Sequence, residues 1–181
     1  LLTSVMTTDS TPPGEDHVCR SSLKEVGEEV SAFRLPGVGD DGIEMFALSD
    51  YTTEGALILL FYPFDFSPIC TTQLCRFRDA EWLTVTENVD VVGISIDSAY
   101  SHQQFRDEYN LPFPLLTDRL ASVAEQFGVK YDEWENHPAV PQRSVFAIDE
   151  THTIRYRWHT ADATTEPNLT DLEAAIGWMV E

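Results

Sequence analysis

An apolar run that leads through a proline-bearing loop into a helix constrains the fold more than any other feature of this chain. The run Ala56–Leu60 (ALILL) contains no polar residue, which is typical of a strand buried on both faces. The segment Phe61–Cys75 follows, and an approximate apolar stripe indicates a helix over residues 67–86. The sequence therefore predicts a strand–loop–helix unit that delivers Cys70 to the first turn of the helix.

The predicted position of Cys70 gives its sulfur a reason to be reactive. The first turn of a helix has unpaired backbone N–H groups and about half a positive charge, which favour a thiolate over a thiol. A single buried cysteine is nevertheless more often a small apolar side chain than a nucleophile. Cys70 by itself therefore leaves both interpretations open.

Several segments of the chain, in the same order, resemble the peroxiredoxins of the AhpC/TSA superfamily. The family's active-site pattern is Pro, three residues, Thr or Ser, two residues, Cys, and this chain has Pro63, Ser67 and Cys70 at those positions. A second cysteine, Cys75, is similar to that of the bacterioferritin comigratory protein or peroxiredoxin Q branch. The resemblance continues, in family order, through Val26–Glu28, Val91–Ser95, Phe113–Asp118 and Arg143–Asp149.

The rest of the chain alternates short apolar segments with segments of helical periodicity, which predicts an α/β domain. We expect strands at residues 31–35, 44–47, 57–62, 89–96 and 113–116, and a hairpin at residues 144–148 and 153–158. Glycines at residues 37–42 predict a turn there. We expect further helices at residues 100–109, capped by Ser98 or Ser101, at residues 121–127, ended by Gly128, and at residues 169–180.

This mixture of elements fits a thioredoxin-like fold, a central mixed β-sheet flanked by helices, which the resemblance also implies. Residues 1–22 have no periodic apolar pattern and are interpreted as a mobile N-terminal tail. The peroxiredoxin domain should then occupy residues 23–181. Neither an internal repeat nor a second domain is visible.

The resemblance implies a thiol-dependent peroxidase that reduces hydrogen peroxide and organic hydroperoxides. Cys70 would attack the peroxide and become a sulfenic acid. Arg143 would place a permanent cation beside the sulfur and donate to a peroxide oxygen. Ser67 would hydrogen-bond both sulfur and peroxide, and Pro63 would shape the pocket and exclude water. Backbone N–H groups at Ile69 and Cys70 would complete this set of fixed donors.

Cys75 is the candidate thiol that resolves the sulfenic acid. In an ideal helix two residues five positions apart have Cα atoms roughly 8–9 Å apart, whereas a disulfide needs them below about 7 Å. The first turns of the helix would have to unwind in each cycle, as the resemblance to peroxiredoxin Q also implies. An external dithiol protein such as thioredoxin, or a related carrier such as glutaredoxin, would then reduce the disulfide.

Two other readings of the same residues remain open. Residues 134–141, an ordered excursion with Pro138 and Pro141, resemble the one-cysteine peroxiredoxins of actinobacteria at least as much as peroxiredoxin Q. In that case an external thiol would resolve Cys70 directly. Alternatively, the protein is a redox sensor whose oxidised helix docks a partner. The sequence is compatible with a monomer or a homodimer.

The charge and the cysteine content limit which binding partners and which cellular compartment we expect. Asp and Glu number 31 against 11 Lys and Arg, for a formal charge of -20, and these scattered acids favour a halophilic source. Such a surface would not neutralise phosphates, so we expect neither nucleic-acid nor anionic-membrane binding. Three cysteines and no visible signal peptide predict a cytoplasmic protein. The histidines and cysteines lack metal-ligand spacing and no dinucleotide motif is present, so we expect no cofactor.

Overall fold

The computed structural model describes residues 21–51 and 55–180 of the chain. Cys19 and nearly all of the expected N-terminal tail therefore lie outside the described residues. Within the described ranges, no helix is both long enough and apolar enough to cross a lipid bilayer.

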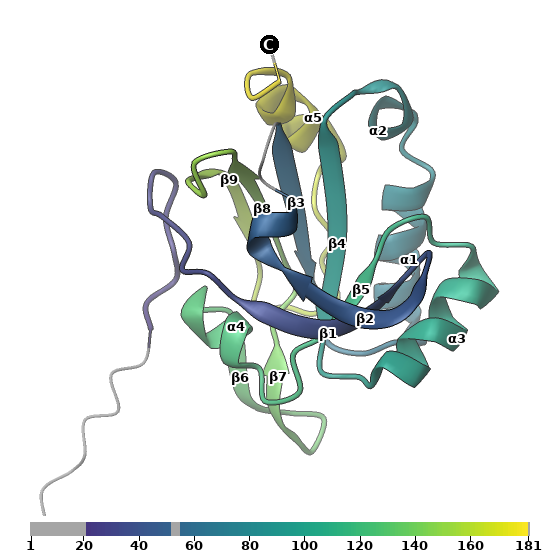
Figure 1. The fold of residues 1–181 in the computed structure, drawn as a ribbon. Helices are drawn as coiled ribbons and strands as arrows, with labels where there is room; N and C mark the ends of the chain where they lie inside the picture. Colours follow the sequence, from purple (N-terminus) through teal and green to yellow (C-terminus); the bar gives the residue numbers. More distant parts are fainter. Residues whose placement is uncertain (1–20, 52–54, 181) are drawn as a thin grey trace, which may run out of the picture.

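A seven-stranded mixed sheet forms the centre of the molecule (Figure 1). Its strands lie in the order β2-β1-β5-β4-β3-β8-β9. β3, β4 and β5 are mutually parallel, whereas β1 and β8 run antiparallel to their neighbours. The strands are β1 (Arg34–Gly39), β2 (Gly42–Ala47), β3 (Ala56–Phe61), β4 (Val89–Ser95), β5 (Leu115–Thr117), β8 (Ser144–Asp149) and β9 (Ile154–His159).

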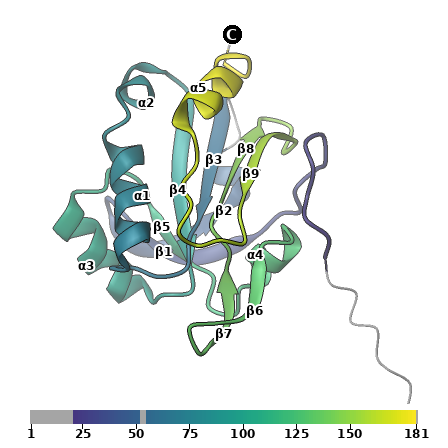
Figure 2. The same ribbon diagram turned by 180° about the vertical axis from the view of Figure 1, so that it is seen from behind.

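Helices cover both faces of this sheet, which confirms the expected fold class. Figure 2 shows α1 (Pro68–Arg78), α3 (Ala99–Tyr109) and α5 (Leu169–Gly177) lying over one face. The short α2 (Glu81–Val85) packs on the same core through Trp82 and Leu83. The opposite face is covered by α4 (Ser122–Gln126) and the 3-10 helix η1 (Leu48–Asp50), which share the other core cluster.

The apolar run predicted as a buried strand is β3, and its side chains contribute to the core clusters on both faces of the sheet. Every residue of β3 is buried. Successive side chains of a strand point to opposite faces, so Leu57, Leu59 and Phe61 pack with α4 while Ile58 and Leu60 pack with α1, α3 and α5. The next residue, Tyr62, belongs to the α1 side together with Cys70. The site therefore forms at the carboxyl end of β3, on the face covered by α1.

The helix expected over residues 67–86 is interrupted, and this prediction was wrong in its extent. α1 ends at Arg78, and α2 begins at Glu81 after Ala80 adopts an extended backbone (φ -72, ψ 103). The break re-aims the chain so that Trp82 and Leu83 contact the same core cluster as Phe77. The sequence did not indicate this break because neither Gly nor Pro, the residues that most often end a helix, stands there.

The turn expected at residues 37–42 was also too long. β1 continues to Gly39 and pairs with β2, leaving a two-residue turn before Gly42 (φ 98). Gly37 lies inside β1. A glycine is needed at this position because a Cβ would come within 2.5 Å of the Leu116 side chain on neighbouring β5. That glycine serves close packing between strands rather than a turn.

Residues 130–141 form a hairpin, of which the sequence indicated only residues 134–141, as an ordered excursion. β6 (Lys130–Trp134) pairs with β7 (His137–Pro141) in a separate two-stranded sheet. Its two-residue turn places Glu135 (φ 51) and Asn136 (φ 60) in the left-handed region that such turns require. Glycine usually fills these positions, and its absence hid the hairpin.

The remaining elements lie close to their expected positions. The hairpin near the C-terminus is confirmed as the antiparallel pair β8–β9. Of the two candidate caps for α3, Ser98 is the one used, because its hydroxyl accepts a hydrogen bond from the Ser101 N–H at 3.2 Å. α5 ends at Gly177, earlier than expected, and the first strand begins later, at Arg34.

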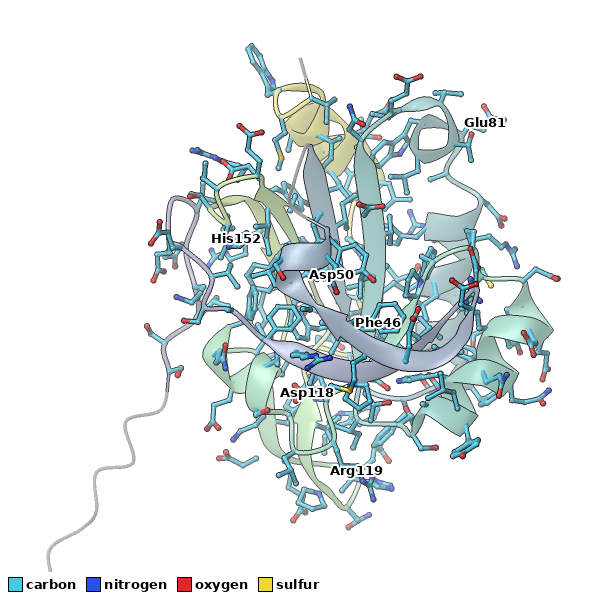
Figure 3. All side chains as sticks on the ribbon, in the orientation of Figure 1. Phe46, Asp50, Glu81, Asp118, Arg119 and His152 are labelled. Atoms are coloured by element: carbon cyan, nitrogen blue, oxygen red, sulfur yellow. The ribbon has the colours of Figure 1, made fainter. Side chains whose placement is uncertain are left out.

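Asp118, labelled in Figure 3, shows how the segment after β5 builds its structure. Its side chain is buried, and its carboxylate accepts hydrogen bonds from the backbone N–H groups of Ser122, Val123 and Ala124, each at 2.9 Å. These donors are the unpaired first-turn N–H groups of α4. The carboxylate therefore replaces a capping residue, since Ala121 at the N-cap position has no side-chain oxygen.

Candidate active site

Cys70 lies in the first turn of α1, as the sequence predicted. Ser67 is the N-cap, and Pro68 takes the first helical position, where a missing N–H costs nothing. The Thr71 N–H closes the first turn on the Ser67 carbonyl at 2.9 Å. The N–H groups of Ile69 and Cys70 are among those without a partner inside the helix. The Cys70 side chain is fully buried, so a substrate reaches its sulfur only when covering side chains move.

Arg143 is brought to Cys70 by the pairing of two strands. β8 runs antiparallel to β3 with Ser144 opposite Phe61, so the residue before β8 lies beside the loop that follows β3. The Arg143 side chain is 1% exposed, and its Nη2 donates to the Cys70 Sγ at 3.4 Å. The register of the sheet therefore brings together two residues that are 73 positions apart in the sequence.

The guanidinium of Arg143 is held on all three nitrogens. Nε and Nη2 donate to the carbonyl oxygen of Ala163 at 3.1 and 3.0 Å, and Nη1 donates to Gln73 Oε1. Its hydrogen bonds to the described residues reach a carbonyl, an amide and a sulfur, and none reaches a carboxylate. A buried cation without an anionic partner is costly. Among these partners only Cys70, as a thiolate, can supply the negative charge.

Gln73 is a site residue that the sequence analysis missed. It lies three positions after Cys70 on α1, hence on the same helix face, and its side chain is 1% exposed. Its Oε1 accepts from Arg143, while its Nε2 has no hydrogen-bond partner among the described residues. A polar residue at helical spacing from the reactive cysteine, inside an otherwise apolar stripe, was the signal that could have revealed it.

Pro63 and Ser67 flank the loop between β3 and α1. Pro63 is buried just after the strand ends, and Ser67 is half-buried with an extended backbone (φ -67, ψ 142). The Ser67 hydroxyl makes no capping hydrogen bond. The structure thus places both residues at the sequence positions and in the loop that the motif requires.

Cys75 lies on the same uninterrupted helix as Cys70. Both are free thiols, Cys70 buried and Cys75 half-buried. In regular helical geometry their Cα atoms, roughly 8–9 Å apart, are too far apart for a disulfide. Its neighbour Arg76 ties α1 to the segment before α5 through an ion pair with Glu166 at 3.2 Å. A bond between the two sulfurs therefore requires α1 to open.

A mixed sheet that presents a buried thiol at a helix start, against an arginine, defines a thiol-based oxidoreductase. Residues 26–157 match the AhpC/TSA family. The chain therefore belongs to this family and is a peroxiredoxin, an enzyme that reduces peroxides at the expense of a thiol reductant.

Two curated relatives and one solved structure illustrate the similarity. The chain is 41% identical over 138 residues to "Putative peroxiredoxin bcp" of Coxiella burnetii, covering 74% of this chain and 87% of the relative. It is 35% identical over 137 residues to "Peroxiredoxin Bcp" of Bacillus subtilis, covering 74% and 84%. The crystal structure of peroxidoxin BcpB from Mycobacterium tuberculosis superposes with a TM-score of 0.73 at 28% identity, over 85% of this chain and 97% of that one.

Proposed function

We propose that Cys70 is the residue that attacks the peroxide, and that hydrogen peroxide and organic hydroperoxides are the substrates. The observation that carries this proposal is the 3.4 Å contact between Arg143 Nη2 and Cys70 Sγ at the start of α1. The Cys70 thiolate attacks the O–O bond, an S–O bond forms, and the departing oxygen takes a proton to leave as water or an alcohol. The sulfur loses two electrons and becomes a sulfenic acid.

The surrounding donors stabilise the charge that moves from sulfur to oxygen. Arg143 shifts a hydrogen bond from the sulfur to a peroxide oxygen, which a fixed cation can do without reorganising its other contacts. The Ser67 hydroxyl, which is not used as a helix cap, is a second donor. Backbone N–H groups of Ile69 and Cys70 add to these, and buried Pro63 limits the access of water.

Cys75 completes the proposed cycle as the resolving thiol. Its sulfur attacks the sulfenic acid of Cys70, a disulfide forms, and water leaves. Because both cysteines lie on α1, the helix must open before this step and close after reduction. A thioredoxin-like dithiol protein supplies the two electrons and two protons that regenerate both thiols, which fits a cytoplasmic location.

A one-cysteine cycle is the second candidate, because α1 is intact and holds the two sulfurs apart. In that cycle an external thiol attacks the sulfenic acid of Cys70 directly, and Cys75 has no role. A mass measurement after one equivalent of peroxide separates the two cycles. The two-cysteine cycle gives a chain lighter by two hydrogens, whereas the one-cysteine cycle gives a chain heavier by one oxygen.

Turnover with a thioredoxin system, in high salt, tests the proposal with wild type, Cys70→Ser and Cys75→Ser side by side. Loss of turnover in both variants, with one equivalent of peroxide still consumed by Cys75→Ser, supports the two-cysteine cycle. Survival of Cys75→Ser supports the one-cysteine cycle. Cys19→Ser serves as the control for loss of a thiol. Absence of turnover in the wild type would favour a redox sensor whose oxidised helix docks a partner.

A further inference from the structure

The loop between Pro63 and Ser67 is anchored by a buried polar cluster, none of whose members hydrogen-bonds the Cys70 sulfur. Asp65 in this loop is 8% exposed, although it carries a carboxylate. That carboxylate accepts hydrogen bonds from the Tyr62 hydroxyl at 2.8 Å and the Ser101 hydroxyl at 2.7 Å. We call the following residues the Asp65 cluster: Tyr62, Asp65, Ser95, Asp97, Ser101 and His102.

His102, from α3, is a cluster member with no exposed surface. Its Nδ1 lies 2.9 Å from Asp65 Oδ2, and its Nε2 lies 3.1 Å from the carbonyl oxygen of Leu116. A carbonyl oxygen can only accept, so Nε2 carries a proton. A second proton must lie between Nδ1 and the carboxylate, because two facing lone pairs would repel. Asp65 and His102 are therefore joined by a hydrogen bond through Nδ1.

The backbone of the loop is fixed by a third element. The Asp65 N–H donates to Asp97 Oδ2 at 2.8 Å, and the Ser95 hydroxyl donates to the same oxygen at 2.8 Å. Burial raises the pKa of Asp97, and the nearby Asp65 carboxylate raises it further. The loop is thus tied to the end of β4, to α3 through Ser101 and His102, and to β5 through Leu116.

The segment held by these hydrogen bonds contains a residue with an unfavourable backbone conformation. Phe66, between Asp65 and Ser67, has φ 62, in the left-handed region that a bulky non-glycine residue rarely adopts. Its ring packs on Phe105 of α3 at 4.9 Å between centroids. Such a conformation persists only where surrounding contacts impose it, and it sets the direction in which the chain enters α1.

We propose that Asp65 and His102 are positioning residues for the peroxidase reaction, which fix the Pro63–Ser67 loop so that Cys70 and the Ser67 hydroxyl meet the peroxide in the productive geometry. This inference rests on the proposed role of Cys70 as the attacking residue. Neither Asp65 nor His102 makes a hydrogen bond to the Cys70 sulfur. A buried ionisable pair is poor at adding stability compared with apolar side chains, but it specifies one arrangement of the groups around it.

The test compares two reactions of Cys70 in Asp65→Ala and His102→Ala. Reaction with hydrogen peroxide and alkylation by iodoacetamide both require the side chains that cover Cys70 to move, but only the reaction with hydrogen peroxide also requires alignment with Arg143 and Ser67. We expect the peroxide rate constant to fall about 100-fold and the alkylation rate to change less than about threefold, because small misplacements have large effects on aligned reactions. Equal changes in both rates, or no change in either, would overturn the proposal.

Asp65→Asn tests whether hydrogen bonding is what positions the loop. Its amide oxygen still accepts from Tyr62, and its amide nitrogen donates to Nδ1 of a neutral His102, so the loop remains tied. We expect a peroxide rate within about threefold of wild type. A loss equal to that of Asp65→Ala would contradict positioning by these hydrogen bonds. Ser101→Ala removes a single bond from Asp65 and provides a milder variant if the alanine variants fold poorly.

Asp118→Ala is the matched control, because Asp118 is also a buried carboxylate but caps α4 instead of holding the loop. It should lower the melting temperature without changing the ratio of the two rates. Hydrogen exchange gives a readout independent of peroxide chemistry: Asp65→Ala should accelerate exchange in residues 64–70 and leave the peptide of α4 unchanged. Unchanged exchange in residues 64–70 would overturn the inference, whereas a wild type inert to peroxide would overturn only the proposed function.

Discussion

The carbonyl oxygen of Ala163 accepts two hydrogen bonds from the Arg143 guanidinium, through Nε at 3.1 Å and Nη2 at 3.0 Å. Nη2 is also the nitrogen that donates to Cys70 Sγ. The segment between β9 and α5 therefore orients the cation that faces the sulfur. Because the carbonyl is uncharged, it directs the guanidinium without competing for its charge.

Replacing Arg143 by lysine should impair the reaction although the positive charge remains. An ammonium group cannot reach Ala163, Gln73 and Cys70 with the planar geometry of a guanidinium. Since loss of one aligned donor typically costs 10²–10³-fold, we expect Arg143→Lys to slow peroxide reduction by about that factor. Stopped-flow measurement of a single turnover checks this. Arg76→Gln, on the exposed side of α1, should leave the rate within about twofold.

Gln73 tests the requirement that Cys70 supply the negative charge beside Arg143. A carboxylate at this position, in Gln73→Glu, would pair with the guanidinium in place of the thiolate. We expect at least about a tenfold decrease in the rates of both peroxide reduction and alkylation of Cys70. Gln73→Met, similar in shape and uncharged, should decrease the alkylation rate much less. Equal rates for the two variants would show that shape, not charge, matters at this position.

The sequence predicted the parts of the site that depend on a local motif. Pro63, Ser67, Cys70 and Cys75 lie within one strand–loop–helix unit, and Arg143 precedes a recognisable strand. Gln73 was missed because its role appears only when a residue 70 positions away reaches it. His102 was interpreted as one of several histidines without metal-ligand spacing, because its contact with Asp65 joins residues 37 positions apart.

The errors in secondary structure have a similar origin. The break between α1 and α2 allows Trp82 and Leu83 to pack against the core cluster. A periodic apolar stripe in the sequence does not specify this packing. The glycines at positions 37 and 39 were taken for turn residues, whereas strand packing against Leu116 and Phe46 explains them. In both cases tertiary contacts overrode a local preference, and the layered α/β architecture was unaffected.

The ion pair between Arg76 and Glu166 should slow the opening of α1. It joins the helix to the segment before α5 at 3.2 Å, and both side chains are partly exposed. Exposed pairs contribute roughly 0.2–1 kcal/mol, so Glu166→Gln should accelerate disulfide formation between Cys70 and Cys75 by a factor between about 1.4 and 5. Quenched-flow mass measurement of the disulfide after peroxide addition checks this. Glu173→Gln removes an exposed charge from α5 and should have no effect on this rate.

Asp149 should make part of the stability of the fold decrease as the pH becomes acidic. Burial acts to raise the pKa of Asp149, but hydrogen bonds from Thr151, Arg155 and Thr153 outweigh it and hold the pKa below the ordinary 3.8. A lowered folded-state pKa gives stability that is present above about pH 4 and is lost as the pH falls through the folded value.

Comparison with Asp149→Asn isolates this contribution from the other carboxylates, which titrate alike in both proteins. At pH 7 the variant should unfold with a free energy about 1–3 kcal/mol smaller, as expected for a poorly replaced set of hydrogen bonds to a charged group. Below pH 3 the difference should shrink. Urea unfolding between pH 2.5 and 7 measures it, and a difference that stays constant with pH would contradict the assignment.

The formal charge of -20 predicts that salt stabilises the fold. Repulsion among scattered acids opposes the compact state, and the Debye length falls from about 10 Å at 0.1 M to about 3 Å at 1 M salt. The urea midpoint should therefore rise between 0.1 and 1 M NaCl. Glu87→Lys combined with Glu173→Lys replaces two exposed acids and reduces the repulsion. The double variant should be more stable in low salt and gain less from added salt, whereas an equal gain in both proteins would attribute the effect to general salting-out.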